Sequence, residues 1–189
     1  MTKNKTERIL NNKIIPSQIE DACIEALQHY PELDHKKIVF KFQKTVGSTM
    51  FAQPLPNFLF RSVRKRGYTI KISNNVDLEN GIRIADMPHE VLVGWIGHEL
   101  GHVMDYEQKS NWQLVKFGIG YLFSARYRVG SEKVADLFAI EHGLGNFILE
   151  TKNYILDHSS ISEKYKNKIK NIYLSPEETL AMIHQMEAN

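Results

Sequence analysis

The sequence predicts a compact α+β fold in which a small mixed sheet packs on two helices. Three observations support this prediction. The stretches 38–42 and 68–73 alternate apolar and polar residues with the period of two that is typical of strands. Much of the second half of the chain carries apolar residues at helical spacing. The length of 189 residues suits a single domain over 1–189, with a flexible N-terminal arm at 1–15.

The composition excludes several classes of protein. Hydrophobic residues make up 42% of the chain and charged residues 24%, which excludes a disordered or low-complexity chain. The formal net charge of +2 is too small to indicate a nucleic-acid partner. Cys23 is the only cysteine, which excludes an intrachain disulfide. Residues 1–8 are not followed by the apolar core of a secretory signal, so we expect a cytoplasmic protein.

The first helix is expected to begin at Ser17 and to stop before Pro31. Ser17 and Glu20 have the spacing of a capping box, in which the hydroxyl accepts a hydrogen bond from the third helical N–H. Apolar side chains then recur at three and four residues and predict one buried stripe: Ile19, Ala22, Cys23, Ala26, Leu27 and Tyr30. We interpret Cys23 as an inert core residue, because no His or Lys is placed beside its thiol by the sequence.

The predicted sheet begins with the strand at 38–42. The next segment, 43–60, is expected to be irregular, because glycine and prolines interrupt its pattern. A second strand follows at 68–73, and a third short strand is predicted at 82–84. A basic run without interleaved aromatic residues predicts a solvated face, and it comprises Arg61, Arg64, Lys65 and Arg66.

A long helix is predicted from Pro88 to about Glu107. Proline suits the first helical position, because its missing N–H has no intrahelical partner there. Gly94, Gly97 and Gly101 lie inside this helix, where a glycine costs about 1 kcal/mol relative to alanine. We therefore expect the sheet or a second helix to approach the glycine side closely.

The most apolar stretch of the sequence is 112–123. It contains Lys116 and is much shorter than the roughly 20 apolar residues that a bilayer-spanning helix needs. We therefore expect a buried helical segment here, with an element that contacts a membrane surface or lines a substrate site as the alternative.

Two further helices are predicted toward the C-terminus. Gly130 and Ser131 indicate a break and an N-cap before a helix at 132–144. Ser175 and Glu178 have the spacing of a capping box, and the proline between them suits the first position of a short final helix.

The predicted long helix contains His98-Glu99-Leu100-Gly101-His102, an H-E-x-x-H motif. Residues four apart lie on one face of a helix, so His98 and His102 can direct two ring nitrogens at one Zn²⁺ ion. Glu99 lies about 100° further around the helix. Its carboxylate can polarise a metal-bound water as general base without being a ligand.

A catalytic zinc site needs a third protein ligand and an open position. The histidine that short-spaced sites carry six residues after the motif is absent. We choose Glu132 as the third ligand, and Asp136 follows four residues later on the same helix face. Asp136 can accept the free ring N–H of a ligand histidine and so fix its tautomer. Asp105 and Glu141 are the substitutes for Glu132.

A water-activating zinc site also needs a donor that stabilises the oxyanion formed during hydrolysis. Four residues near Glu132 in the sequence are candidates, each with a structural role as its alternative: Tyr121, Tyr127, Arg128 and His142.

With E-K-V-A-D at 132–136 downstream of H-E-L-G-H, the sequence resembles the gluzincin metallopeptidases over residues 68–145. The run 132–139 is most similar to the branch of the CAAX prenyl endopeptidases. The resemblance implies a zincin-like domain that holds one Zn²⁺ ion. It also implies that an extended peptide substrate adds to the free edge of the strand before the long helix, at 68–73 or 82–84.

The resemblance also implies the role of each site residue. The ligands are His98, His102 and Glu132, while Glu99 is the general base and acid. Asp136 is the partner of a ligand histidine.

The sequence therefore predicts a zinc-dependent endopeptidase in which a metal-activated water hydrolyses the peptide bond. Members of the CAAX branch usually carry transmembrane helices around these motifs, and this sequence has none there. We expect a stand-alone catalytic domain without a transmembrane anchor, for which peripheral membrane contact stays open. The alternatives are a regulatory protease with one protein substrate, of the small HELGH type, and a catalytically silent binding module that zinc stabilises.

Overall fold

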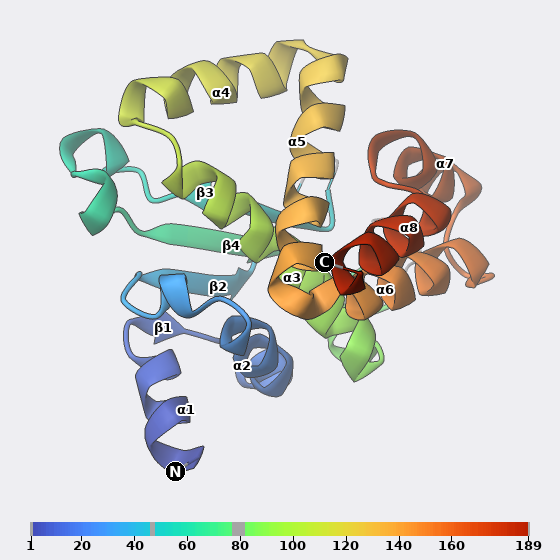
Figure 1. The fold of residues 1–189 in the computed structure, drawn as a ribbon, viewed down its shortest axis with the longest axis horizontal. Helices are drawn as coiled ribbons and strands as arrows, with labels where there is room; N and C mark the ends of the chain where they lie inside the picture. Colours follow the sequence, from blue (N-terminus) through green and yellow to red (C-terminus); the bar gives the residue numbers. More distant parts are fainter. Residues whose placement is uncertain (1, 46–47, 77–81, 189) are drawn as a thin grey trace.

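The computed structural model describes residues 2–45, 48–76 and 82–188. The expected α+β class with a small mixed sheet is confirmed within these residues (Figure 1). The sheet has the order β1-β2-β4-β3, and β3 is antiparallel to β4 while the other pairs are parallel. The strands are β1 (Lys13–Ile14), β2 (Ile38–Phe42), β3 (Met50–Pro54) and β4 (Tyr68–Ile72).

The strand β3 lies in the segment 43–60 that was expected to be irregular. Met50 and Ala52 are buried and pair with Ile72 and Ile70 of β4. The short apolar alternation therefore forms a strand in spite of the nearby prolines. Pro54 is the last residue of an outer strand, where a missing N–H is tolerated.

The expected third strand at 82–84 is wrong. Arg83 makes an isolated bridge with Asn75, and the chain then enters a 3₁₀ helix at Ile84–Asp86. One bridge is too short to continue as a strand. The other 3₁₀ helices in the described residues are Ser17–Ile19, Pro31–Leu33, Phe58–Phe60 and Val63–Lys65.

The N-terminal segment, expected as a flexible arm at 1–15, instead contains secondary structure. The helix α1 (Thr2–Leu10) buries Ile9, and β1 pairs with the first two residues of β2. The arm was expected because polar residues dominate this segment, although Ile9 is buried.

The predicted capping box at Ser17 is wrong. Pro16 takes the position before the turn, so Ser17 already lies inside a 3₁₀ helix and its side chain caps nothing. The helix α2 (Glu20–Gln28) follows, and its predicted apolar stripe is buried as expected. Cys23 is a free, fully buried thiol whose pKa is raised by burial, which agrees with an inert core residue.

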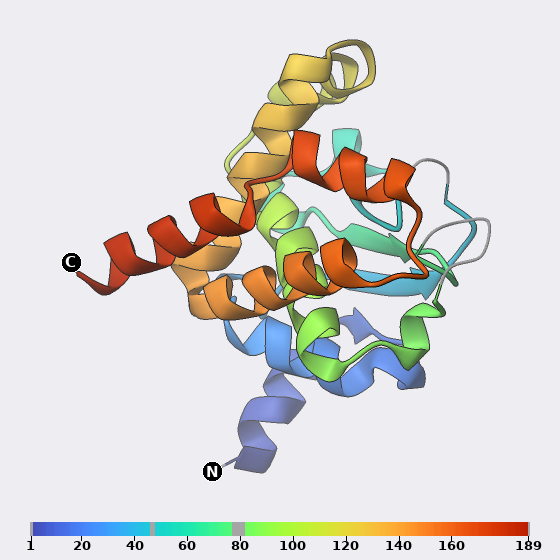
Figure 2. The same ribbon diagram turned by 90° about the vertical axis from the view of Figure 1, so that its right-hand side faces the viewer.

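The long helix α3 (His89–Glu107) is the centre of the molecule. It lies between the sheet and the C-terminal helices and packs against α2, β3, α5 and α6 (Figures 1 and 2). Pro88 is the N-cap of α3 and not its first helical residue, because its ψ of 144° is extended. The remaining helices are α4 (Asn111–Phe123), α5 (Ala125–Ala139), α6 (Gly145–Asp157), α7 (Glu163–Ile172) and α8 (Pro176–Glu187).

The expected break at Gly130 and Ser131 does not occur, because α5 runs through both residues. Ser124 provides an earlier N-cap, and its hydroxyl accepts from the backbone N–H of Tyr127. The chain turns later, in a π-helical segment where Gly143 has a φ of 79°. The capping box of α8 at Ser175 and Glu178 is confirmed.

The helix α4 is less buried than the sequence predicts. Leu114 and Phe117 are buried, whereas Trp112 is 75% exposed and Phe123 is 84% exposed. Only one face of α4 packs on the rest of the molecule, so high overall hydrophobicity does not mean burial here. Among the described residues, no helix has both the length and the apolar character needed to cross a bilayer.

The basic run is a solvated face only in part. Arg61, Arg64 and Lys65 are exposed as expected, whereas Arg66 is buried. The guanidinium of Arg66 donates to the carbonyl oxygen of Tyr106 at 2.7 Å, at the C-terminal end of α3. Arg66 is therefore a structural residue that satisfies helix-end carbonyls.

Candidate metal centre

The helices α3 and α5 approach each other closely at a glycine. An added Cβ atom on Gly101 would lie 2.3 Å from the carbonyl oxygen of Ala135, and one on Gly94 would lie 2.2 Å from that of Phe147 in α6. An added Cβ atom on Gly97 would lie 2.6 Å from Cδ1 of Leu144. The expectation of a closely packed neighbour is confirmed, and this packing places Glu132 opposite the histidines of α3.

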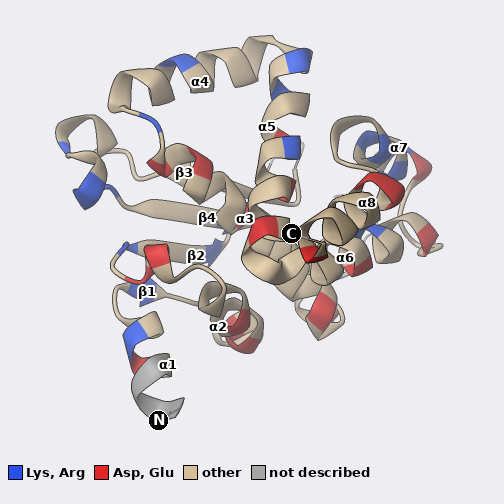
Figure 3. Ribbon diagram, viewed as in Figure 1, with Lys and Arg blue, Asp and Glu red and all other residues tan. Residues whose placement is uncertain are grey.

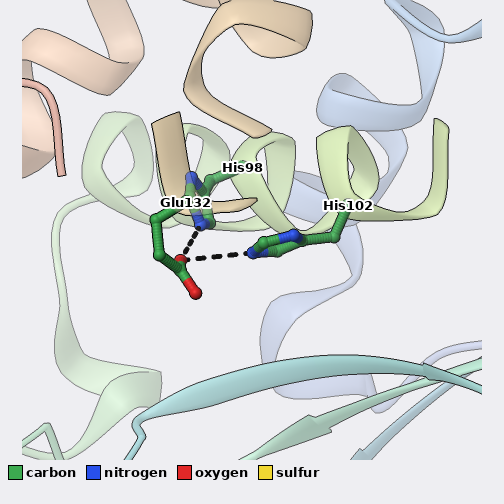
Figure 4. Close-up of side chains that lie close together, drawn as sticks. All are labelled: His98, His102 and Glu132. Atoms are coloured by element: carbon green, nitrogen blue, oxygen red, sulfur yellow. Dashed lines mark hydrogen bonds and ion pairs between the residues drawn. The ribbon is translucent and has the colours of Figure 1, made fainter. Parts of the chain in front are cut away.

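The structure brings His98, His102 and Glu132 together, with both imidazole rings directed at the carboxylate (Figure 4). The Nε2 atoms of His98 and His102 lie 3.0 Å and 3.2 Å from Oε2 of Glu132. One ligand atom from each residue lies within 4.8 Å of the others, and all three side chains are buried. The buried His-His-Glu group can therefore hold a metal ion.

The three residues offer a donor set that suits a metal ion. Two imidazole nitrogens and one carboxylate oxygen lie within 4.8 Å of one another, close enough to converge on one ion. Zinc is among the divalent ions that accept two nitrogens and one oxygen as ligands.

Asp136 lies behind His98 and holds its ring. Nδ1–H of His98 donates to Oδ1 of Asp136 at 2.9 Å, so Nε2, which faces Glu132, is the nitrogen that can bind a metal ion once it loses its proton. Oδ2 of Asp136 accepts from Nζ of Lys152 at 2.8 Å and from the backbone N–H of Leu174 at 3.2 Å. The predicted position of Asp136 beside a site histidine is thus observed.

These contacts control the protonation of the site. Burial lowers the pKa of His98, but hydrogen bonds to Asp136 and Glu132 outweigh this effect and raise it to about 10. Burial raises the pKa of Glu132, but the two histidines outweigh it and hold the pKa well below its usual range. Metal binding must therefore displace the proton from Nε2 of His98. Glu132, because of its lowered pKa, is already in the ionised form that a ligand needs.

Glu99 is buried next to the cluster and is only partly satisfied. The backbone N–H of Ala52 in β3 lowers the pKa of its carboxyl group, while Oε2 has no hydrogen-bond partner among the described residues. Burial raises the pKa of Glu99, against the lowering effect of His102 and His98. A carboxylate with a raised pKa is a better proton acceptor than an ordinary surface carboxylate.

Tyr121 and Arg128 lie near the cluster, but both make structural contacts. The hydroxyl of Tyr121 donates to Oε1 of Glu132 at 2.7 Å, so it orients the candidate ligand. The guanidinium of Arg128 donates to the carbonyl oxygens of Tyr121 and Leu122 at the end of α4.

The structure places Tyr127 and His142 elsewhere. The ring of Tyr127 packs edge-on against Phe117 and is 43% exposed. His142 stacks on Tyr30 in the core and bonds the carbonyl oxygen of Phe138. Neither residue lines the cleft at Glu132.

The substitute ligands are not part of the cluster either. Asp105 forms an ion pair with Lys109, and Glu141 is exposed. The 3.6-residue period of α5 places Glu132 and Asp136 on the face toward α3, which is the arrangement expected for Glu132 as third ligand.

Sequence reasoning missed Lys152 and Tyr173. The side chain of Lys152 bonds Asp136, and the ring of Tyr173 lies 5.3 Å from that of His98. A signal for Lys152 was present, because it shares a helical stripe with the buried Ile148 and Ile155. A lysine on an apolar stripe indicates a buried acidic partner. Tyr173 lies between two helices and carries no such signal.

The free sheet edge is not where the sequence predicts it. The strand β4 is paired on both sides, so the outer strand beside α3 is β3. At Ala52 the carbonyl oxygen of β3 accepts from the hydroxyl of Tyr106 at 3.3 Å.

Comparisons of the chain with protein-family models, with curated proteins and with solved structures found no match.

Proposed function

We propose that this chain is a zinc-dependent peptidase with a zincin-like fold. The observation that carries the proposal is the convergence of His98, His102 and Glu132, with the carboxylate of Glu99 buried beside them. A metal site needs the first three residues only. Glu99 has no role as a ligand, and its partly unsatisfied carboxylate is explained by a role in proton transfer.

The residues of the chain then have separate tasks. When bound, the zinc ion supplies Lewis-acid activation of water and of the scissile carbonyl. Glu99 takes the proton from the attacking water and passes it to the leaving amine. Asp136 keeps the lone pair of His98 on Nε2, and Tyr121 orients the carboxylate of Glu132.

Metal analysis together with the substitution Glu99→Gln tests the proposal. The wild-type protein should contain about one zinc ion per chain and cleave a casein-type substrate. Glu99→Gln should keep the metal and lose cleavage by at least about 100-fold, as expected for a general base. A variant that keeps both the metal and the activity contradicts the role of Glu99.

A second candidate function is a binding module in which zinc ties α3 to α5. The burial of all three ligand side chains, with exposed fractions of 4–6%, favours this alternative because it restricts the access of a substrate to a bound ion. A wild-type protein that holds zinc but cleaves nothing in a broad peptide library supports it. A regulatory protease is distinguished by cleavage of one protein substrate and not of casein.

A further inference from the structure

A cleft of about 530 Å³ opens at Glu132 and is lined by basic residues from four parts of the chain. They are Lys44 after β2, Lys71 in β4, Arg128 in α5 and Lys168 in α7. Figure 3 shows that basic residues also gather along α7. Among the described residues that line the cleft, Glu132 is the only acid. Its carboxylate is bonded by the two histidines and by Tyr121, and its charge also acts on Lys168, so one acid faces four basic residues.

The other end of β3 borders a hollow of different character. Phe51, Tyr121 and Leu122 line both the cleft and this second hollow, so the two spaces adjoin. The hollow lies between β3 and α4 and has a mainly apolar lining, which includes Pro54, Phe58, Tyr106, Leu114 and Phe117. A chain that lies along β3 therefore meets positive charge at one end and apolar side chains at the other.

We propose that the substrate is a polypeptide segment with acidic residues on one side of the cleaved bond and bulky apolar residues on the other. This inference rests on the proposed peptidase function. Like charges held around one cleft repel each other and attract an anionic ligand, and low-dielectric walls strengthen this attraction. The apolar hollow adds affinity through burial of apolar surface. Acidic groups of the ligand balance the excess of positive charge in a lining that holds four basic residues and one acid.

A binding experiment with the zinc-loaded Glu99→Gln protein tests the substrate class without requiring turnover. Fluorescent peptides carry three Glu next to three Leu, in both orders, and matched peptides carry Gln in place of Glu. At low salt, fluorescence anisotropy should show that the better Glu peptide binds about 10-fold or more tightly than its Gln counterpart. The difference should shrink as ionic strength rises. Equal binding of the Glu and Gln peptides overturns the proposal.

Two double variants locate the recognition. Lys71→Gln with Lys168→Gln should abolish the preference for Glu peptides. The control, Lys41→Gln with Lys170→Gln, changes the net charge equally at exposed residues of β2 and α7 outside the cleft lining, and it should keep the preference. An equal loss in both variants shows an effect of overall charge and contradicts the proposal.

The same peptides separate this inference from the peptidase function. Wild-type protein that cleaves Glu and Gln peptides equally fast is a peptidase without the proposed preference. Preferential binding of Glu peptides without any cleavage contradicts the peptidase function. It still supports the inference that the cleft binds acidic polypeptide segments.

Discussion

Lys152 and Asp136 form a buried ion pair directly behind a candidate metal ligand. Nζ of Lys152 lies 2.8 Å from Oδ2 of Asp136, and the two residues are 4% and 1% exposed. The other oxygen of Asp136 accepts from His98. Nζ of Lys152 also donates to the hydroxyl of Thr179 at 2.8 Å, so the pair links α5, α6 and α8.

We expect Lys152→Met to lower the free energy of unfolding by about 3–5 kcal/mol, because Oδ2 of the buried Asp136 carboxylate loses its cationic donor. Urea denaturation of the zinc-free protein measures this loss directly. The control is Lys133→Met, which breaks a partly exposed pair with Glu178 and should cost less than about 1 kcal/mol. Similar losses in the two variants would show that the Lys152 pair contributes no more than a surface ion pair.

Asp136→Asn should weaken zinc binding by about 10-fold to 100-fold, because the ligand histidine loses the charged acceptor that orients its ring. Competition with a chromophoric chelator measures the change in Kd. Asp105→Asn is the control, since Asp105 pairs with Lys109 outside the cluster. An unchanged Kd for Asp136→Asn, or a large loss for Asp105→Asn, would contradict the ligand set.

Zinc should raise the melting temperature of the protein. At a free zinc concentration 100 times Kd, linkage adds about 2.7 kcal/mol to the folded state, which corresponds to roughly 5–10 °C for a chain of this size. Differential scanning calorimetry should show this shift for wild type but not for His98→Gln or His102→Gln. Magnesium, which prefers all-oxygen sites, should produce no shift. A zinc shift that survives both substitutions would indicate binding elsewhere.

Local patterns were sufficient to predict the helix that carries the motif and two strands of the sheet. The apolar stripe of α2 and the alternation in β2 are fixed by neighbouring residues, and both are observed as expected. The relation between Glu132 and the histidines was predictable for a similar reason. Two residues at helical spacing define a face, and glycines at 94, 97 and 101 indicate where another helix approaches.

The errors arose where distant contacts decide the outcome. The strand β3 exists because its residues pair with β4, whereas local prolines argue against it. Arg66 is buried because the carbonyl of Tyr106 needs a donor, which no local pattern reveals. The N-cap is the residue whose backbone is still extended, and the sequence does not show which serine that is. The N-cap of α5 is Ser124, whereas Ser131 lies inside the helix.

The close approach of α3 and α5 gives the last prediction. Gly101→Ala would place a Cβ atom 2.3 Å from the carbonyl oxygen of Ala135, which is main chain and cannot rotate away. The helices must separate, and we expect a loss of about 1–3 kcal/mol in the free energy of unfolding. Separation also moves Glu132 away from the histidines, so the affinity for zinc should fall.

The matched control is Gly130→Ala, in the same α5 helix, where an added Cβ atom meets nothing within 4 Å. This substitution should stabilise the protein by up to about 1 kcal/mol through helix propensity and leave the Kd for zinc unchanged. Urea denaturation and chelator competition on both variants measure the two effects. If Gly101→Ala also stabilises the protein and keeps its zinc affinity, the contact between Gly101 and Ala135 does not determine the spacing of the metal site.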